Sequence, residues 1–175
     1  YNRLFAVNTT ISQSTAGDVI LYEIQTGGIN STNNKPNYVP AEYVNSIWDA
    51  TKAATTAGIH IVAAAGNGGQ NLDNSSYISY VNRGDSGAII VGAGSNTTTH
   101  SRLSFSTYGQ RVNVQGWGSN VLTTGYGNYV MLANDPNQSY TLFSGTSSAT
   151  PIVASCVIAL LSRAKASNYN LSPTE

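Results

Sequence analysis

The sequence is 175 residues long, enough chain for one domain with a sizeable core. Its formal net charge is zero and only 9% of its residues are charged, so it has no electrostatic basis for binding nucleic acid or an anionic membrane surface. The single cysteine excludes an internal disulfide framework, and no run of about eighteen apolar residues predicts a membrane span. Much of the polar character comes from Asn, Ser, Thr and Tyr, a bias that favours a secreted, extracellular protein.

The first predicted elements are a strand, a loop and a helix. Residues 18–24 form an apolar run bounded by glycines, which indicates a buried strand. Residues 29–39 are polar and contain a proline, as expected of a surface loop. The pattern of residues 40–57 predicts a helix, and Gly58 is its C-terminal stop.

The rest of the chain is predicted to hold more strands and one long helix. The predicted strands are residues 59–65, 88–93 and 111–115, with two shorter segments around 120–124 and 140–143. A glycine- and asparagine-rich loop, residues 66–87, separates the first two of these strands.

The last helix shows a stripe of apolar residues at three-to-four spacing, so one side of it should pack on the sheet. Strands that alternate with helices and carry near-continuous apolar runs predict a parallel sheet covered on both faces. We therefore expect an α/β fold with a doubly wound, mostly parallel sheet. The stripe consists of Ile152, Val153, Cys156, Val157, Leu160 and Leu161, and we expect Cys156 to be a small core residue.

The stretch GTSSATP at residues 145–151 enters this helix and carries the clearest chemical signal. Its proline is tolerated in a first turn, where a backbone N–H has no intrahelical partner. Ser147 would hold its hydroxyl at the positive end of the helix dipole, which favours a developing alkoxide. An N-cap hydroxyl would suit any helix start, and Ser148 is the one rival nucleophile. The pattern indicates a nucleophilic Ser147, with Gly145 and Thr146 shaping the turn close to substrate.

A second motif, GIHIVAAAGNGG at residues 58–69, is typical of a buried strand that ends in a glycine-flanked asparagine. Asparagine is common after glycine in turns, so this motif alone is ambiguous. Together with GTSSATP, however, it resembles the subtilisin-like serine protease family, whose nucleophile signature is G-T-S-x-A-x-P. The resemblance covers roughly residues 17–165, and it continues through residues 84–94, 103–121 and 140–151.

The resemblance implies a serine endopeptidase that hydrolyses peptide bonds of a polypeptide through an acyl-enzyme. Ser147 would attack the peptide carbonyl. The side-chain amide of Asn67 and the backbone N–H of Ser147 would bind the oxyanion of the tetrahedral intermediate.

A base and an orienting carboxylate are also needed, and in the family both precede the oxyanion asparagine in the chain. The chain has two histidines, and neither lies in a segment that matches the family's catalytic histidine. We expect His60 to be a buried structural residue with a hydrogen-bond partner, because it lies within a strand. His100 lies in a polar loop, and Asp18 is better read as the entry residue of its strand.

Three accounts of the missing base and carboxylate stay open. In the first, residues 1–175 are part of a subtilase catalytic domain, the half with nucleophile and oxyanion hole, and an upstream segment or chain supplies Asp and His. The second is a nicked enzyme whose pieces stay associated, and the third is a homologue that keeps the fold as a non-catalytic binding domain. The start at Tyr1 rather than Met favours a processed product or a partial sequence. An esterase is disfavoured because no G-x-S-x-G motif is present.

The resemblance also places the substrate against main chain at the end of the first strand. A match without gaps puts Glu23 and Ile24 at that edge, and we prefer it. A match on the paired glycines would instead put Gly27 and Gly28 there.

The walls of the S1 pocket would come from Ala64, Ala65 and Gly66, whose small size leaves room for a sizeable P1 side chain. No cofactor is expected. No metal site is expected either, because the loop carboxylates are scattered singly, at Asp73, Asp85 and Asp135.

Overall fold

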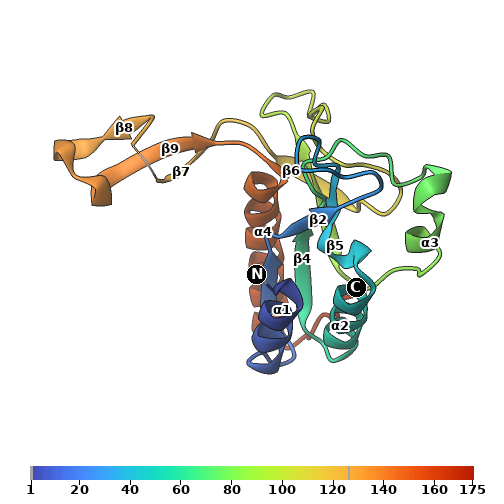
Figure 1. Ribbon diagram of the computed structural model, residues 1–175. Helices are drawn as coiled ribbons and strands as arrows, with labels where there is room; N and C mark the ends of the chain where they lie inside the picture. Colours follow the sequence, from blue (N-terminus) through green and yellow to red (C-terminus); the bar gives the residue numbers. More distant parts are fainter. Residues whose placement is uncertain (1, 126) are drawn as a thin grey trace.

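The computed structural model describes residues 2–125 and 127–175. Its centre is a four-stranded parallel sheet in the order β1-β4-β5-β6 (Figure 1). The strands are β1 (Val19–Tyr22), β4 (His60–Ala64), β5 (Ile89–Gly94) and β6 (Val114–Trp117). The predicted parallel sheet is confirmed, and β1 and β6 are its edges within the described part of the chain.

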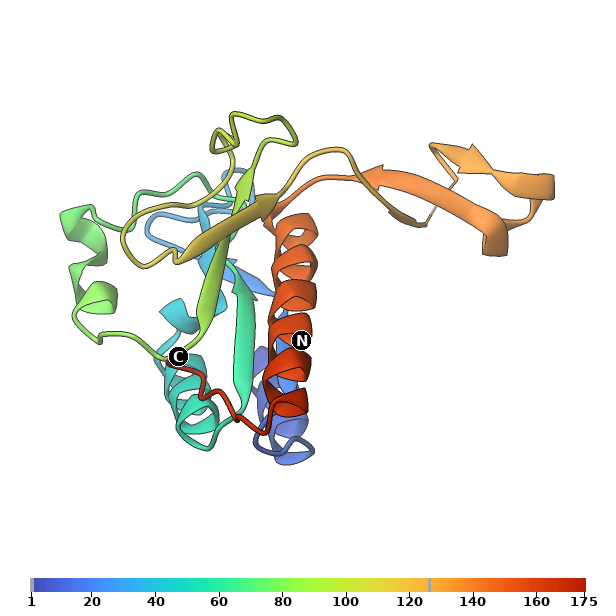
Figure 2. The same ribbon diagram turned by 180° about the vertical axis from the view of Figure 1, so that it is seen from behind.

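Helices cover both faces of this sheet. Ile61 and Ala63 of β4 belong to a core cluster with residues of α1 (Arg3–Ser12) and α2 (Asn45–Thr56). Val62, between them in sequence, packs with Ala149 and Ala154 of α4 (Thr146–Ala166) on the other face. This alternation is expected because successive strand side chains point to opposite faces. Figure 2 shows α4 in front of the sheet and α1 behind it, the doubly wound arrangement predicted from the sequence.

The region from residue 25 to residue 57 differs in part from its prediction. The end of the predicted loop forms β3 (Tyr38–Pro40), which pairs antiparallel with β2 (Gln25–Gly27). A 3₁₀ turn, Ala41–Tyr43, follows, and extended backbone at Val44 separates it from α2. The predicted continuous helix over 40–57 is therefore wrong at its start, although Gly58 ends it in a left-handed conformation as expected.

Two other predictions need smaller corrections. The loop over 66–87 contains the 3₁₀ turn Ser75–Tyr77 and the short helix α3 (Ile78–Val81). The strand predicted at 111–115 begins only at Val114, because the chain turns just before it. In that turn the Val112 N–H donates to the Gly109 carbonyl over 3.0 Å.

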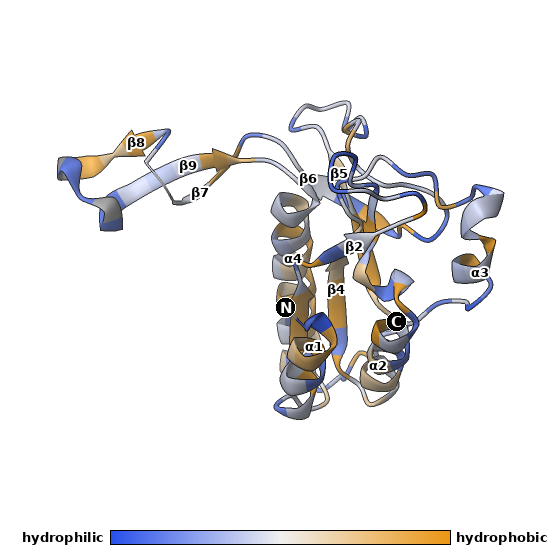
Figure 3. Cartoon of the chain, in the orientation of Figure 1, coloured by the Kyte–Doolittle hydropathy of each residue, from blue (hydrophilic) through white to orange (hydrophobic). Residues whose placement is uncertain are grey.

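The two short β segments predicted near the end of the chain form a separate arm. β7 (Val121–Thr124) and β8 (Val130–Met131) both pair antiparallel with β9 (Ser139–Phe143), and the 3₁₀ turns Leu132–Asn134 and Pro136–Gln138 lie between β8 and β9. Figures 1 and 2 show this arm extending away from the body of the molecule. Much of its apolar surface is exposed, and Figure 3 shows hydrophobic residues in β8 and at the end of β9.

α4 packs on the sheet through fewer of its residues than predicted. Val153 and Val157 join the core cluster, but Leu160 is 59% exposed and Cys156 is also exposed, so the expectation of a core cysteine is wrong. The reason is geometric: the sheet-facing line of the helix runs through Ala149, Val153 and Val157, and Cys156 lies about 100° to one side of Val157. By length and composition α4 could cross a membrane, but the core helix of a soluble protein passes the same test.

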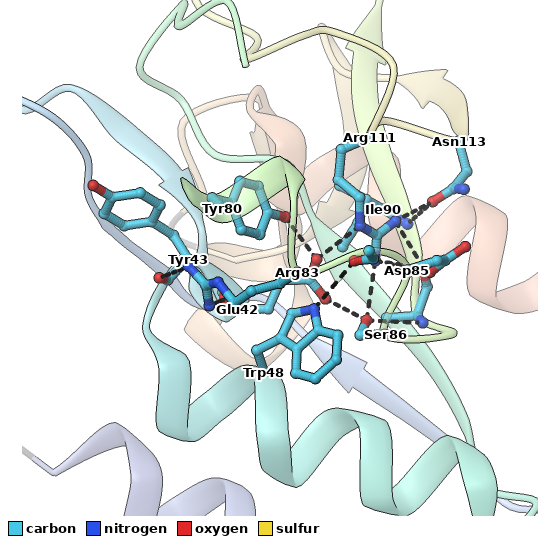
Figure 4. A network of polar contacts seen from close by, with 12 residues as sticks. Glu42, Tyr43, Trp48, Tyr80, Arg83, Asp85, Ser86, Ile90, Arg111 and Asn113 are labelled. Atoms are coloured by element: carbon cyan, nitrogen blue, oxygen red, sulfur yellow. Dashed lines mark hydrogen bonds and ion pairs between the residues drawn. The ribbon is translucent and has the colours of Figure 1, made fainter. Parts of the chain in front are cut away.

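A buried polar cluster links the segments that precede β5 and β6 to the 3₁₀ turn before α2 (Figure 4). The carboxylate of Glu42 accepts hydrogen bonds from the Tyr80 hydroxyl at 2.6 Å, from Arg111 Nε at 2.9 Å and from the Ser86 hydroxyl at 2.5 Å. Glu42 is 3% exposed and Arg111 8%. Burial and the Glu42 charge raise the pKa of Tyr80, so its hydroxyl stays a donor. Arg111 also forms a longer ion pair, 3.3 Å, with the exposed Asp85.

Candidate active site

The two residues predicted to carry the chemistry lie at the carboxyl edge of the parallel sheet. Asn67 follows the end of β4 by three residues, and Ser147 is the second residue of α4. Loops at the carboxyl ends of parallel strands are where such folds place their sites, because the helices that follow begin there. At this edge Asn67 is in direct contact with Thr146, the residue before Ser147, although the two are 79 positions apart in sequence.

Thr146 holds the side chain of Asn67. The backbone N–H of Thr146 donates to Asn67 Oδ1 over 2.8 Å, and the Thr146 hydroxyl donates to the same atom over 2.9 Å. A backbone N–H can only donate, so the accepting atom must be the amide oxygen. Asn67 Nδ2 donates to no acceptor within residues 2–125 and 127–175, so its two hydrogens are free to bind another group. The Asn67 backbone is fixed as well, since its N–H donates to Gln25 Oε1 over 2.8 Å.

Gly145 leaves open the space between two hydrogen-bond donors. A Cβ placed on it would lie 3.3 Å from Asn67 Nδ2 and 3.6 Å from the backbone nitrogen of Ser147. The Ser147 N–H is in the first turn of α4, where no intrahelical acceptor exists, and it has no hydrogen-bond partner in residues 2–125 and 127–175. Gly145 also has φ +147°, which other residues rarely adopt. Two free donors thus border one small space, as an oxyanion site requires.

Ser147 and its rival Ser148 differ in access to solvent. Ser147 is partly exposed and lines a pocket of about 580 Å³. Ser148 borders the same pocket but is only 2% exposed, and its hydroxyl is buried without a partner among the described residues. The nucleophile must reach a peptide carbonyl from the pocket, so this difference favours Ser147.

The pocket beside Ser147 is built from three parts of the chain. They are the end of β1, the β7–β9 arm and the first turns of α4. Its walls include Glu23, Val121, Phe143, Pro151 and Ile152. The arm residues were not foreseen as pocket residues, because the pairing of β7 with β9 that brings them here leaves no local sequence signal.

Of the two residues placed at the substrate edge by the gap-free match, only Glu23 faces this pocket. Ile24 is partly buried and packs against the core cluster on the α1 and α2 side. Gln25, which supports Asn67, was missed, although its place just after a strand end was a usable signal. Gly28 lies near the Tyr77 hydroxyl, which accepts from the following N–H.

The residues expected as S1 walls are closely packed within the sheet edge. Ala64 is 1% exposed and Ala65 is fully buried, and neither borders the pocket beside Ser147. Gly66 has φ +97°, and a Cβ on it would lie 2.9 Å from the main chain of Tyr38. Its N–H donates to the Thr146 hydroxyl over 3.3 Å. These positions need small residues because backbone segments meet here.

Neither histidine borders the pocket with Ser147. His60 is the first residue of β4, at the opposite end of that strand from Asn67, and is 5% exposed. Burial lowers its pKa, and the nearby main chain of Leu171 acts in the opposite direction. Its Nε2 has no partner among the described residues, where we expected a hydrogen bond. Asp18 closes the turn before β1 by accepting from the Thr15 N–H at 2.8 Å, as expected of a strand-entry residue.

Comparison with known proteins assigns the family. The model of the subtilase family matches residues 8–175. The chain belongs to the subtilase family. A subtilisin-like serine protease of Rhodotorula mucilaginosa, Rho m 2.0101, is 37% identical over 113 residues. Subtilisin DY of Bacillus licheniformis is 33% identical over 118 residues.

Solved structures agree on the fold. A cold adapted subtilisin-like serine proteinase matches with a TM-score of 0.63 and 21% identity, covering 97% of this subtilase chain. The prenylagaramide maturation protease PagA matches with a TM-score of 0.65 and 19% identity over 98% of the chain. The chain spans only 49% and 52% of the length of these two solved proteins. The match with the Rhodotorula protease covers 65% of this chain and 29% of that protein, and the match with subtilisin DY covers 67% and 38%.

Proposed function

We propose that this chain is the nucleophile and oxyanion-hole part of a subtilisin-like serine endopeptidase. Ser147 attacks the carbonyl carbon of a peptide bond and forms an acyl-enzyme. Asn67 Nδ2 and the Ser147 N–H stabilise the negative oxygen that develops in the tetrahedral intermediate. The observation that carries this proposal is the pair of free donors on either side of the space at Gly145.

We further propose that the catalytic Asp and His come from a segment or chain that is not part of these 175 residues. Support comes from the position of both histidines outside the Ser147 pocket and from the half-length coverage of solved subtilases. Two surfaces of the described chain suit such a neighbour. β1 pairs only with β4, and α4 exposes apolar residues such as Ile158 and Leu160.

A non-catalytic binding domain is the competing function, and the position of both histidines outside the pocket is compatible with it as well. We propose that the chain belongs to a secreted protein, because its polar residues are mainly Asn, Ser, Thr and Tyr, and that its substrate is a polypeptide, because its relatives are named as subtilisins and serine proteases. An extended polypeptide would bind beside Glu23 and Ile24 in either case.

A digestion assay, in which the complete natural protein acts on an unfolded polypeptide substrate, distinguishes the endopeptidase from the binding domain. The enzyme should cleave it, and Ser147→Ala should abolish cleavage. Ser148→Ala is the matched control: it removes a buried, unpartnered hydroxyl from the next residue and should leave cleavage near the wild-type rate. Binding of the polypeptide without cleavage by the wild type would favour the binding domain.

A further inference from the structure

The pocket beside Ser147 offers one charge to whatever enters it. Its volume of about 580 Å³ leaves room for a long side chain next to the serine hydroxyl. Glu23 is the one ionisable residue among the described residues that line the pocket. Among the described residues, a substrate side chain in this pocket therefore meets a carboxylate and no positively charged side chain.

The remaining walls of the pocket suit an aliphatic chain. Val121 and Phe143 come from the arm, and Pro151 and Ile152 from the first turns of α4. Phe143 is 45% exposed, so apolar surface is available to a ligand. A lysine or arginine side chain combines an apolar stem with a cationic end, and such side chains bury the stem along apolar walls.

Glu23 is not committed to another partner. It forms no hydrogen bond or ion pair within residues 2–125 and 127–175, unlike Glu42, whose carboxylate accepts three hydrogen bonds. Partial burial raises the pKa of Glu23, because desolvation disfavours its charged form. A cation in the pocket would offset that cost and give the carboxylate a charge-assisted hydrogen bond.

We propose that this pocket selects a basic side chain, lysine or arginine, at a substrate position flanking the bond that is cut. Glu23 binds the cationic end while the apolar walls hold the stem. The inference rests on the proposed function, because selection is expressed through cleavage at Ser147. It goes further by assigning a substrate class to a specific carboxylate.

The test uses the complete natural protein and three sets of otherwise identical peptides. At each position flanking the scissile bond they carry lysine, norleucine, which keeps the aliphatic stem without the ammonium, or glutamate. At the substrate position whose side chain enters this pocket, we expect a higher kcat/KM for the lysine peptide than for the norleucine peptide. Glu23→Gln should lower that lysine-to-norleucine ratio about fivefold, the upper range for a partly exposed ion pair. Glu23→Lys should favour the glutamate peptide over the lysine peptide.

Asp49→Asn is the matched control. Asp49 is an exposed acid on α2, outside the pocket, so this variant changes the protein charge equally and should keep the wild-type ratio. Cleavage with equal rates for lysine and norleucine, or a ratio that Glu23→Gln leaves unchanged, would overturn the inference while the proposed function stands. A protein that cleaves none of the peptides would overturn both.

Discussion

Two clusters of polar groups in this chain differ in whether their hydrogen-bond donors are paired. Around Glu42, a buried carboxylate, a guanidinium and two hydroxyls contact one another. Around Asn67, the contacts with Thr146 use only the amide oxygen, and neither the amide nitrogen nor the Ser147 N–H donates to an acceptor in the described part of the chain. The first cluster is paired within the protein, whereas the second offers donors to something outside it.

The difference separates stability from function. An unpaired buried polar group costs free energy, so a protein usually pairs its polar groups, as around Glu42. Donors that stay unpaired in a rigid frame are ready to bind charge that appears only during a reaction. Substitutions in the Glu42 cluster should therefore change the free energy of unfolding, and substitutions around Asn67 should change the rate of peptide cleavage.

The largest effect is expected from Glu42→Leu in the complete protein. It removes the buried carboxylate that pairs with Arg111 and leaves this buried charge only the longer ion pair with the exposed Asp85, which should lower the free energy of unfolding by about 3–5 kcal/mol. Denaturant unfolding measures this change. Asp85→Asn is the control, because it weakens the exposed ion pair of the same arginine and should cost about 1 kcal/mol or less. Equal losses in the two variants would contradict the buried-cluster account.

Asn67→Leu should act on the rate instead. In subtilisin, loss of one oxyanion donor costs about 10²–10³ in kcat, and we expect the same range here. Steady-state kinetics of the complete protein on a peptide substrate would measure it, with KM changed little. Thr146→Ser keeps the hydroxyl that holds the amide oxygen and should retain most of the activity. A full-rate Asn67→Leu enzyme would show that this amide does not bind the oxyanion.

The sequence predicted the residues in short motifs of this site, but it did not predict the contacts between distant segments. Asn67 and Ser147 lie in short contiguous motifs, and each motif contains the small residues that its local geometry needs, so local sequence sufficed to find them. The pocket around Ser147 depends on β7 and β9 pairing across a connection of 14 residues, numbers 125–138, and that pairing has no local signal. Gln25 lies just after a predicted strand end, but its partner Asn67 is 42 positions away, so its sequence position did not show what it contacts.

The fold shows the same division. The long apolar runs predicted β4 and β5 to within a residue or two, because strands buried on both faces are nearly continuous in hydrophobicity. The break before α2 was missed, since propensity favoured a helix while β3 pairing held the chain extended through Pro40. Cys156 was misplaced because an apolar helix gives little information about which side faces the sheet.

Gly145→Ala tests the space between the two donors. The new methyl group would sit between them, and φ +147° would strain the backbone, a cost on the order of 1–3 kcal/mol. We expect at least about a tenfold loss of kcat/KM in peptide hydrolysis. Gly84→Ala is the control: φ is +79°, but a Cβ there meets nothing within 4 Å. It should lower stability and leave kcat/KM unchanged, and a parallel loss of activity would argue for a general strain effect.

The smallest predicted effect concerns His60 and pH. Burial lowers its pKa in the folded protein, so below about pH 6.5 the unfolded chain binds more protons than the folded one. The free energy of unfolding should therefore fall as the pH drops through that value. His60→Gln should reduce this fall in denaturant unfolding at pH 7.5 and pH 5.5. His100→Gln, which changes an exposed histidine, should leave it as in the wild type; no difference between the two variants would remove His60 as the cause.

Labelling by a fluorophosphonate, with the modified residue located by mass spectrometry, tests the central claim most directly. The claim is that this chain holds the nucleophile and the oxyanion donors but draws its base from elsewhere. The 175-residue chain alone should label slowly, because without a base the Ser147 hydroxyl stays protonated near neutral pH. Addition of the segment that carries Asp and His should produce rapid labelling at Ser147. Rapid labelling of Ser147 in the isolated chain, or none in the complete protein, would contradict the account.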